Sequence, residues 1–141
     1  MKKILFVCVG NSCRSQMAEG FTRHRGGENI EVKSAGTKPA IAVSSKAQQV
    51  MAEEGIDISS QYPKGFSEED LEWADRVILM GCGIECPNIG VGKDKVEDWG
   101  IDDPIGQPKE KYEEIRDEIK LKVKDLLERL HAPKPQWRRK Y

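Results

Sequence analysis

The chain has 141 residues, of which 38% are hydrophobic, and this length is sufficient for one domain with a buried core. Its 23 Lys and Arg residues nearly balance 24 Asp and Glu residues, which gives a formal net charge of −1. This balance argues against binding to nucleic acid or to an anionic membrane through a basic surface. We expect a single domain over residues 1–132 and a flexible tail over residues 133–141, which contains two prolines and several cations.

No stretch of the sequence approaches the roughly 18–20 apolar residues that a membrane span requires. The first residues lead into a glycine-containing loop and not into a small-residue cleavage site, so a cytoplasmic location is expected. In a reducing cytoplasm, cysteines are more often catalytic or metal-binding than disulfide-bonded. The cysteines are therefore candidate functional residues: Cys8, Cys13, Cys82 and Cys86.

Strand and helix patterns alternate along the chain. Short apolar runs rich in strand formers predict strands at residues 3–8, 30–35, 76–80 and, at a sheet edge, 95–99. Helices are predicted from residue 15 to at least residue 19, near residues 44–54, and at residues 70–74. The clearest helix is the last, where one apolar stripe recurs at spacings of three and four: Ile115, Ile119, Val123, Leu126 and Leu130. This alternation predicts a three-layer α/β/α domain whose ligand lies beyond the carboxyl ends of the strands.

The loop after the first predicted strand has the character of an anion site. It runs through Val9, Gly10, Asn11, Ser12, Cys13 and Arg14, which we call the oxyanion loop. Because a strand ends at Cys8 and a helix begins near Ser15, the backbone N–H groups between them can converge on one anion. The helix N-terminus and the guanidinium of Arg14 both favour the thiolate form of Cys8, which would then be a nucleophile.

The other loop residues suit this role. Arg14 can donate two parallel hydrogen bonds to a tetrahedral oxyanion. Gly10 permits a close approach, Asn11 tolerates a left-handed backbone, and Ser15 can hydrogen-bond the thiolate or cap the helix. The alternative interpretation of this loop is that Cys8 is a buried structural cysteine and Arg14 a solvated arginine, with no anion site.

The pattern of a cysteine, five residues and then Arg-Ser resembles the active-site signature of the low-molecular-weight protein tyrosine phosphatases. Two further features of the sequence fit the same family: Ser-Ala-Gly-Thr at residues 34–37, and Asp103 followed by Pro104. The resemblance implies a four-stranded parallel sheet flanked by helices. It also implies that Asp103 is the general acid that protonates the departing oxygen. By spacing alone Asp102 is an equal candidate, and Asp-Asp-Pro is also a common turn sequence.

Two departures from the phosphatases resemble the thioredoxin-coupled arsenate reductases of this fold. Gln16 stands where the phosphatases have proline, and Ile105 stands where they have an aromatic residue that holds the phosphotyrosine ring. Cys82 and Cys86 follow the third predicted strand, as the redox cysteines of these reductases do. The resemblance implies a relay in which arsenate bonds to Cys8, Cys82 releases arsenite by forming a disulfide with Cys8, and Cys86 then frees Cys8.

Other interpretations of the cysteines stay open. Cys82 and Cys86 also fit a zinc site, a pair of inert buried thiols, or a phosphatase in which Cys82 or Cys13 protects Cys8 from oxidation. Cys13 is otherwise expected to be structural. The alternative functions are a phosphomonoester phosphatase and a non-enzymatic anion or redox sensor. We expect no cofactor and no metal, and as partners an arsenate- or phosphate-like oxyanion and a thioredoxin- or glutaredoxin-like reductant.

Overall fold

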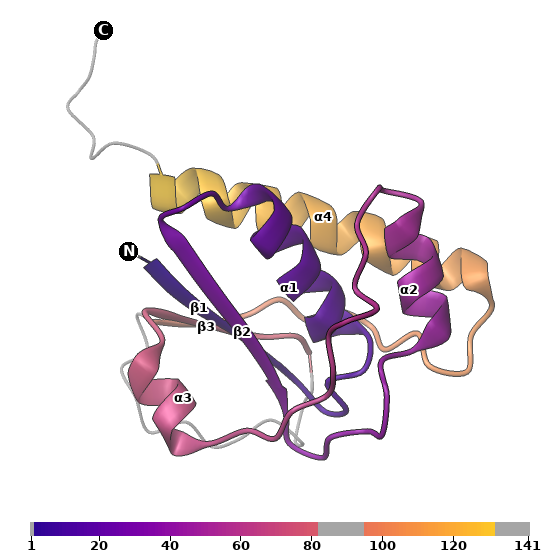
Figure 1. Ribbon diagram of the computed structural model, residues 1–141, viewed down its shortest axis with the longest axis horizontal. Coiled ribbons are helices and arrows are strands. Elements are labelled where there is room, and N and C mark those ends of the chain that lie inside the picture. Colours follow the sequence, from indigo (N-terminus) through magenta and orange to yellow (C-terminus); the bar gives the residue numbers. More distant parts are fainter. Residues whose placement is uncertain (1, 82–94, 132–141) are drawn as a thin grey trace, which may run out of the picture.

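The computed structural model describes residues 2–81 and 95–131, and its centre is a four-stranded parallel sheet (Figure 1). In chain order the strands are β1 (Lys2–Cys8), β2 (Ile30–Gly36), β3 (Arg76–Leu79) and β4 (Val96–Asp98). Their order across the sheet is β2-β1-β3-β4, so β1 lies inside the sheet with β2 and β3 on its two sides. The predicted α/β fold with a four-stranded parallel sheet is confirmed.

β1 has the continuous apolar sequence of a strand that is covered on both faces. Its side chains alternate between two hydrophobic clusters: Ile4, Phe6 and Cys8 belong to one, and Leu5 and Val7 belong to the other. All five are buried. The alternation therefore puts Cys8 on the same face of the sheet as the larger cluster.

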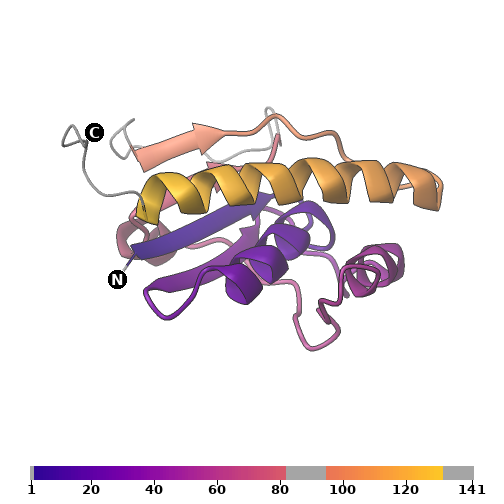
Figure 2. The ribbon, with the colours of Figure 1, turned by 90° about the horizontal axis from the view of Figure 1, so that it is seen from above.

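Within the described ranges, helices cover both faces of the sheet: α1 (Arg14–Arg25), α2 (Ser45–Ala52), α3 (Glu68–Trp73) and α4 (Lys109–His131). The larger cluster joins one face to α1, α2 and α4, and the smaller cluster joins the other face to α3. Figure 1 shows the same three layers, and in Figure 2 α4 runs lengthwise beside the strands. Four residues of the predicted α4 stripe are buried in the larger cluster: Ile115, Ile119, Val123 and Leu126. Leu130, the fifth, is partly buried and packs against the same cluster.

α1 is longer than the helix that the sequence indicated. It continues to Arg25, and its first nine residues are all buried, including the polar Arg14, Gln16 and Glu19. A helix that is buried nearly all round has no polar face, so periodicity does not mark its extent. The predicted bounds of the four strands, α2 and α3 lie within one or two residues of the observed ones, which is the usual uncertainty of an element's ends. For α4 only the stripe was predicted, and the helix begins before it, at Lys109.

The topology brings the candidate residues to one edge of the sheet. Cys8 is the last residue of β1, Arg14 is the first residue of α1, and Asp103 lies in the segment that follows β4. Cys82, Cys86 and the tail at 133–141 lie outside the described residues. None of the helices within residues 2–81 and 95–131 is long and apolar enough to cross a membrane.

Gly36 lets the oxyanion loop pack closely against the end of β2. Cys8 and Gly36 are partners in the register of β1 and β2. A Cβ atom at residue 36 would lie 2.5 Å from the carbonyl oxygen of Val9 and 3.0 Å from the backbone nitrogen of Asn11. These contacts involve backbone atoms, so the loop itself would have to move.

We therefore expect Gly36→Ala to lower the free energy of unfolding by about 1–3 kcal/mol, as overpacking does. Gly65→Ala is the matched control, because a Cβ there would meet only Pro39, at an ordinary contact distance of 3.8 Å. Urea denaturation of the two variants measures the difference. A Gly36→Ala protein as stable as the control would contradict this account of the loop.

Candidate active site

The carbonyl groups of the oxyanion loop point away from its centre. Four carbonyls, counting that of Cys8, accept hydrogen bonds from the chain between residues 37 and 44. Cys8 O accepts from Thr37 N at 3.2 Å, Val9 O from Lys38 N at 2.9 Å, Gly10 O from Ala40 N at 2.9 Å and Ser12 O from Ser44 N at 2.8 Å. With these carbonyls bonded to a neighbouring segment, the backbone N–H groups of the loop are free to serve an anion, and that of Asn11 already points at the Cys8 sulfur.

Asn11 makes the sharpest turn of the loop. It has a φ of 51°, and it is the one non-glycine residue with positive φ in the described part of the chain. This conformation aims the backbone N–H of Asn11 at the sulfur of Cys8, at 3.2 Å. The prediction that Asn11 adopts a left-handed backbone is confirmed, because short polar side chains tolerate this region best.

Cys8 is surrounded by hydrogen-bond donors. Its side chain is only 2% exposed, and its sulfur lies 2.8 Å from the hydroxyl oxygen of Ser15. That oxygen accepts a hydrogen bond of 2.7 Å from the side-chain amide of Asn11. A thiolate at Cys8 has no hydrogen to give, so in that state the Ser15 hydroxyl donates to the sulfur and both neighbours of the sulfur act as donors. Donors of this kind stabilise a thiolate more than a neutral thiol.

Arg14 is a buried cation at the positive end of a helix, where a cation is unfavourable unless an anion compensates it. It is 4% exposed. Its Nη1 donates to the carbonyl oxygens of Met80 at 2.9 Å and Ile101 at 2.8 Å. Its Nη2 lies 3.8 Å from the carboxylate of Asp103. The guanidinium is thus held between the ends of two strands, beside the mouth of the loop.

The geometry favours Asp103 over Asp102 as the acid. The Asp103 carboxylate is 48% exposed, approaches Arg14, and accepts a hydrogen bond of 3.1 Å from the backbone N–H of Ile105. Asp102 is 78% exposed and lies 3.6 Å from the ammonium group of Lys111. Of the two aspartates, Asp103 is therefore the one beside the cation of the oxyanion loop.

Cys13 differs from Cys8 in its surroundings. Burial raises the pKa of the Cys13 thiol far above its usual range, and the negative charges of Asp103 and Cys8 add to the effect. The thiol is therefore neutral at physiological pH and packs in the larger hydrophobic cluster. This environment suits the structural role that the sequence suggested for Cys13.

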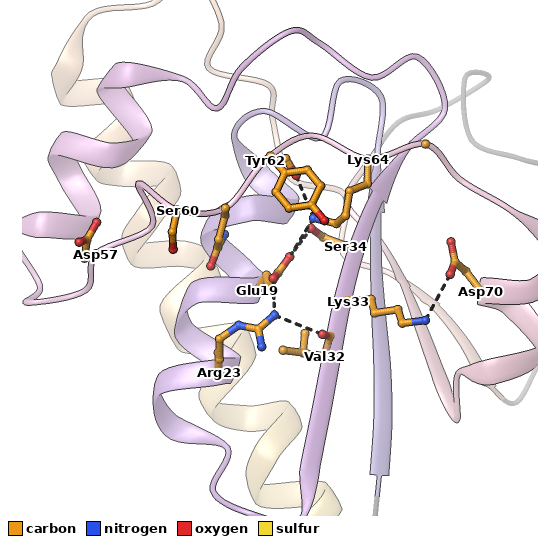
Figure 3. A pocket seen from close by; sticks show the side chains of 12 residues that line it. Glu19, Arg23, Val32, Lys33, Ser34, Asp57, Ser60, Tyr62, Lys64 and Asp70 are labelled. Atoms are coloured by element: carbon orange, nitrogen blue, oxygen red, sulfur yellow. Dashed lines mark hydrogen bonds and ion pairs between the residues drawn. The ribbon is translucent and has the colours of Figure 1, made fainter.

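A polar pocket of about 690 Å³ lies on the other side of the loop (Figure 3). Its buried Glu19 carboxylate accepts hydrogen bonds of 2.5 Å from Ser34 and from Arg23, and lies 3.7 Å from the ammonium group of Lys64. The backbone N–H of Lys64 donates to the side-chain oxygen of Asn11 at 2.8 Å. The wall of the pocket is therefore joined to the oxyanion loop through Asn11.

Several residues that support the site were not assigned a role from the sequence. The carbonyls of Met80 and Ile101 hold Arg14, and the side chain of Gln16 donates to Asn11. Backbone carbonyls carry no sequence signal. Gln16 was noticeable only because it replaces the proline of the phosphatases, and nothing in the sequence indicated its partners.

Comparison with known proteins agrees with this geometry. The sequence matches the low molecular weight phosphotyrosine protein phosphatase family over residues 3–136. This match covers nearly the whole chain, so the protein belongs to that family.

Three similar proteins divide between two activities. A glutaredoxin arsenate reductase from Synechocystis is 40% identical over 92% of this chain and 99% of its own. A solved structure of an arsenate reductase in the phosphate-binding state is 41% identical, with a TM-score of 0.80 over 92% of this chain and 98% of its own. The YwlE arginine phosphatase from Geobacillus stearothermophilus is 33% identical, with a TM-score of 0.84 over 94% of both chains.

We expect Arg14→Lys to weaken the binding of inorganic phosphate by about ten- to a hundredfold, the value of one or two charge-assisted hydrogen bonds. Lysine keeps the charge, but its one ammonium group cannot bond the carbonyls of Met80 and Ile101, as Nη1 of Arg14 does, and also offer a second nitrogen to an oxyanion. Arg25→Lys, at the exposed end of α1, is the control. Isothermal titration calorimetry with phosphate measures both, and equal affinities would contradict the assignment of Arg14.

Proposed function

We propose that the protein is an arsenate reductase in which Cys8 is the nucleophile, Arg14 binds the oxyanion, Ser15 stabilises the thiolate and Asp103 is the proton donor. The observation that carries the proposal is the Cys8 sulfur, which lies within 3.2 Å of two hydrogen-bond donors at the mouth of a loop that ends in a buried arginine. The names of the relatives at about 40% identity supply the choice of arsenate as substrate.

The first step is a substitution at arsenic. The Cys8 thiolate forms a bond to As(V), and one arsenate oxygen leaves with its bonding pair. Asp103 protonates that oxygen, which departs as hydroxide or water according to its own protonation state. Arg14 and the inward N–H groups of the loop stabilise the charge on the remaining oxygens.

The second step is a reduction by thiols. The thiolate of Cys82 attacks the Cys8 sulfur, the S–As bond breaks, and its electron pair stays on arsenic, which leaves as arsenite. Cys86 then attacks Cys82, which moves the disulfide to Cys82 and Cys86 and releases the Cys8 thiolate. A protein dithiol of the thioredoxin or glutaredoxin class reduces that disulfide. Both relay cysteines lie outside the described residues, so their roles rest on the sequence.

A phosphatase is the second candidate, favoured by the structural similarity to an arginine phosphatase. Phosphate and arsenate have the same tetrahedral shape, and a Cys8 phosphate adduct could be hydrolysed by water with Asp103 as base. Against a phosphotyrosine substrate stands Ile105, which is 57% exposed and offers no aromatic ring. The chain also carries two cysteines that hydrolysis does not need.

Substitution of Cys82 separates the two activities. Cys82→Ser is expected to abolish steady arsenite release, because no thiol then attacks the adduct on Cys8. Hydrolysis of an aryl phosphate, which uses Cys8, Arg14 and Asp103, should continue at the wild-type rate. Arsenite release measured with excess dithiol reductant tests this, and sustained turnover by Cys82→Ser would disprove the relay.

Mass spectrometry after a single arsenate turnover without reductant shows which two cysteines hold the disulfide at the end of the cysteine relay. The expected product is a disulfide between Cys82 and Cys86, with Cys8 free to react with an alkylating agent. A remaining disulfide between Cys8 and Cys13 would instead support a protective role for Cys13.

The assignment of the acid is tested by two neighbouring aspartates. Asp103→Asn is expected to slow aryl phosphate hydrolysis by about 10²–10⁴-fold, the usual contribution of a general acid. Asp102→Asn is the control and should stay close to wild type, because Asp102 lies beside Lys111 and not beside Arg14. If the larger loss occurred in Asp102→Asn, the two assignments would have to be exchanged.

A further inference from the structure

The donor behind Cys8 depends on the orientation of a side-chain amide. When Cys8 is a thiolate, the hydroxyl of Ser15, 2.8 Å from the sulfur, must be the donor of that hydrogen bond, and its oxygen at the same time accepts from the NH₂ group of Asn11 at 2.7 Å. If the amide of Asn11 were turned over, its oxygen would face Ser15 and would compete with Cys8 for the hydroxyl hydrogen. What holds the amide of Asn11 in place therefore affects the charge state of the nucleophile.

The amide oxygen of Asn11 is held by two donors. Lys64 N donates to it at 2.8 Å, and the NH₂ group of Gln16 donates to it at 3.1 Å. The same NH₂ group also contacts the backbone carbonyl of Asn11 at 2.9 Å and that of Tyr62 at 3.0 Å. It has two hydrogens for these three acceptors, so one hydrogen is shared between two acceptors. A turned Asn11 would place its own NH₂ group against these donors, so the observed orientation is the one that leaves every group paired.

The orientation of Gln16 is fixed in turn by Gln61. The NH₂ group of Gln61 donates to the side-chain oxygen of Gln16 at 2.7 Å and to its backbone carbonyl at 3.1 Å. Gln16 is fully buried, whereas Gln61 is half-buried in the wall of the polar pocket. Asn11 accepts through its side-chain oxygen from Gln16, and Gln16 accepts in the same way from Gln61, while the NH₂ group of each points along the chain of contacts toward Ser15.

We propose that Gln16 is a positioning residue for Cys8: through Asn11 it makes Ser15 a donor to the thiolate, and Gln61 supports it from the pocket wall. The proposal rests on the proposed function, because it assumes that Cys8 reacts as a thiolate. It adds a chain of hydrogen-bonded side chains, Gln61, Gln16 and Asn11, which we call the amide relay. This amide relay begins outside the oxyanion loop, in a segment far from Cys8 in the sequence. Buried relays of this kind act strongly, because an unpaired group in them is costly.

The test is the rate of alkylation of Cys8 by iodoacetamide as a function of pH, followed by peptide mass spectrometry to separate Cys8 from the other cysteines. Gln16→Met removes the donors and keeps the length of the side chain. We expect the midpoint of the alkylation curve to rise by about one pH unit or more, because loss of a donor disfavours the thiolate. The ionisable neighbours Cys13, Arg14 and Asp103 are unchanged in this variant.

Two further variants make the result specific. Gln61→Met should raise the midpoint by a smaller amount, since Gln16 keeps its own acceptors. Gln48→Met is the matched control: Gln48 lies in α2 and donates to the Val43 carbonyl, not to a residue of the amide relay, so its loss should leave the midpoint unchanged. If Gln16→Met does not fold, Gln61→Met decides the question alone.

The outcomes distinguish the amide relay through Gln61, Gln16 and Asn11 from the proposed arsenate reductase function. A wild-type midpoint near that of a free cysteine, about 8.5, would overturn both. If the wild-type midpoint is low and neither Gln16→Met nor Gln61→Met shifts it, the amide relay is overturned and the proposed function stands. A lower melting temperature without a shifted midpoint would mean that Gln16 only ties the loop to residues 61–62.

Discussion

The site depends on one constraint: the carbonyl groups of the oxyanion loop are hydrogen-bonded to the chain between residues 37 and 44. With four carbonyls bonded to that segment, the N–H groups of the loop are left for another acceptor, which is the arrangement that a backbone anion site requires. The absence of a side chain at Gly36 lets the end of β2 come close enough to form it. Binding of an oxyanion is thus prepared by the folding of two neighbouring loops and not by a concentration of charge.

The buried guanidinium of Arg14 connects this loop to the rest of the sheet. It is bonded to the carbonyls of Met80 and Ile101, which follow β3 and β4, and it approaches the Asp103 carboxylate. Cys8 and Arg14 stand at the two ends of one loop, whereas Asp103 comes from a distant part of the chain, and Arg14 contacts the segments that follow the other two strands. Gly81 has a φ of 91°, and a Cβ atom there would lie 2.7 Å from the backbone nitrogen of Ile101. The segment that leads to Cys82 therefore begins at a position where the backbone itself requires glycine.

One scaffold supports two reactions because the first step is shared. A thiolate in a ring of N–H groups attacks phosphorus or arsenic in the same way, and the outcome depends on what next attacks the adduct. Water at phosphorus gives hydrolysis, whereas a thiol at the Cys8 sulfur gives reduction. In the proposed mechanism, the additional cysteines after β3 therefore favour reduction over hydrolysis.

The sequence by itself determined the elements that are local. The apolar run before Cys8, the spacing from Cys8 to Arg14 and the stripe of α4 each reflect short-range periodicity or a turn, so the fold class and the oxyanion loop could be predicted. The preference for Asp103 came from resemblance, since Asp102 has an equivalent place in the sequence. The tertiary structure gives the two carboxylates different neighbours, since Asp103 lies beside Arg14 and Asp102 beside Lys111, and this supports the preference without testing the role. It also decided the full length of α1, the carbonyl partners of Arg14 and the amide relay through Gln16, because these depend on segments brought together by folding and leave no periodic pattern in the chain.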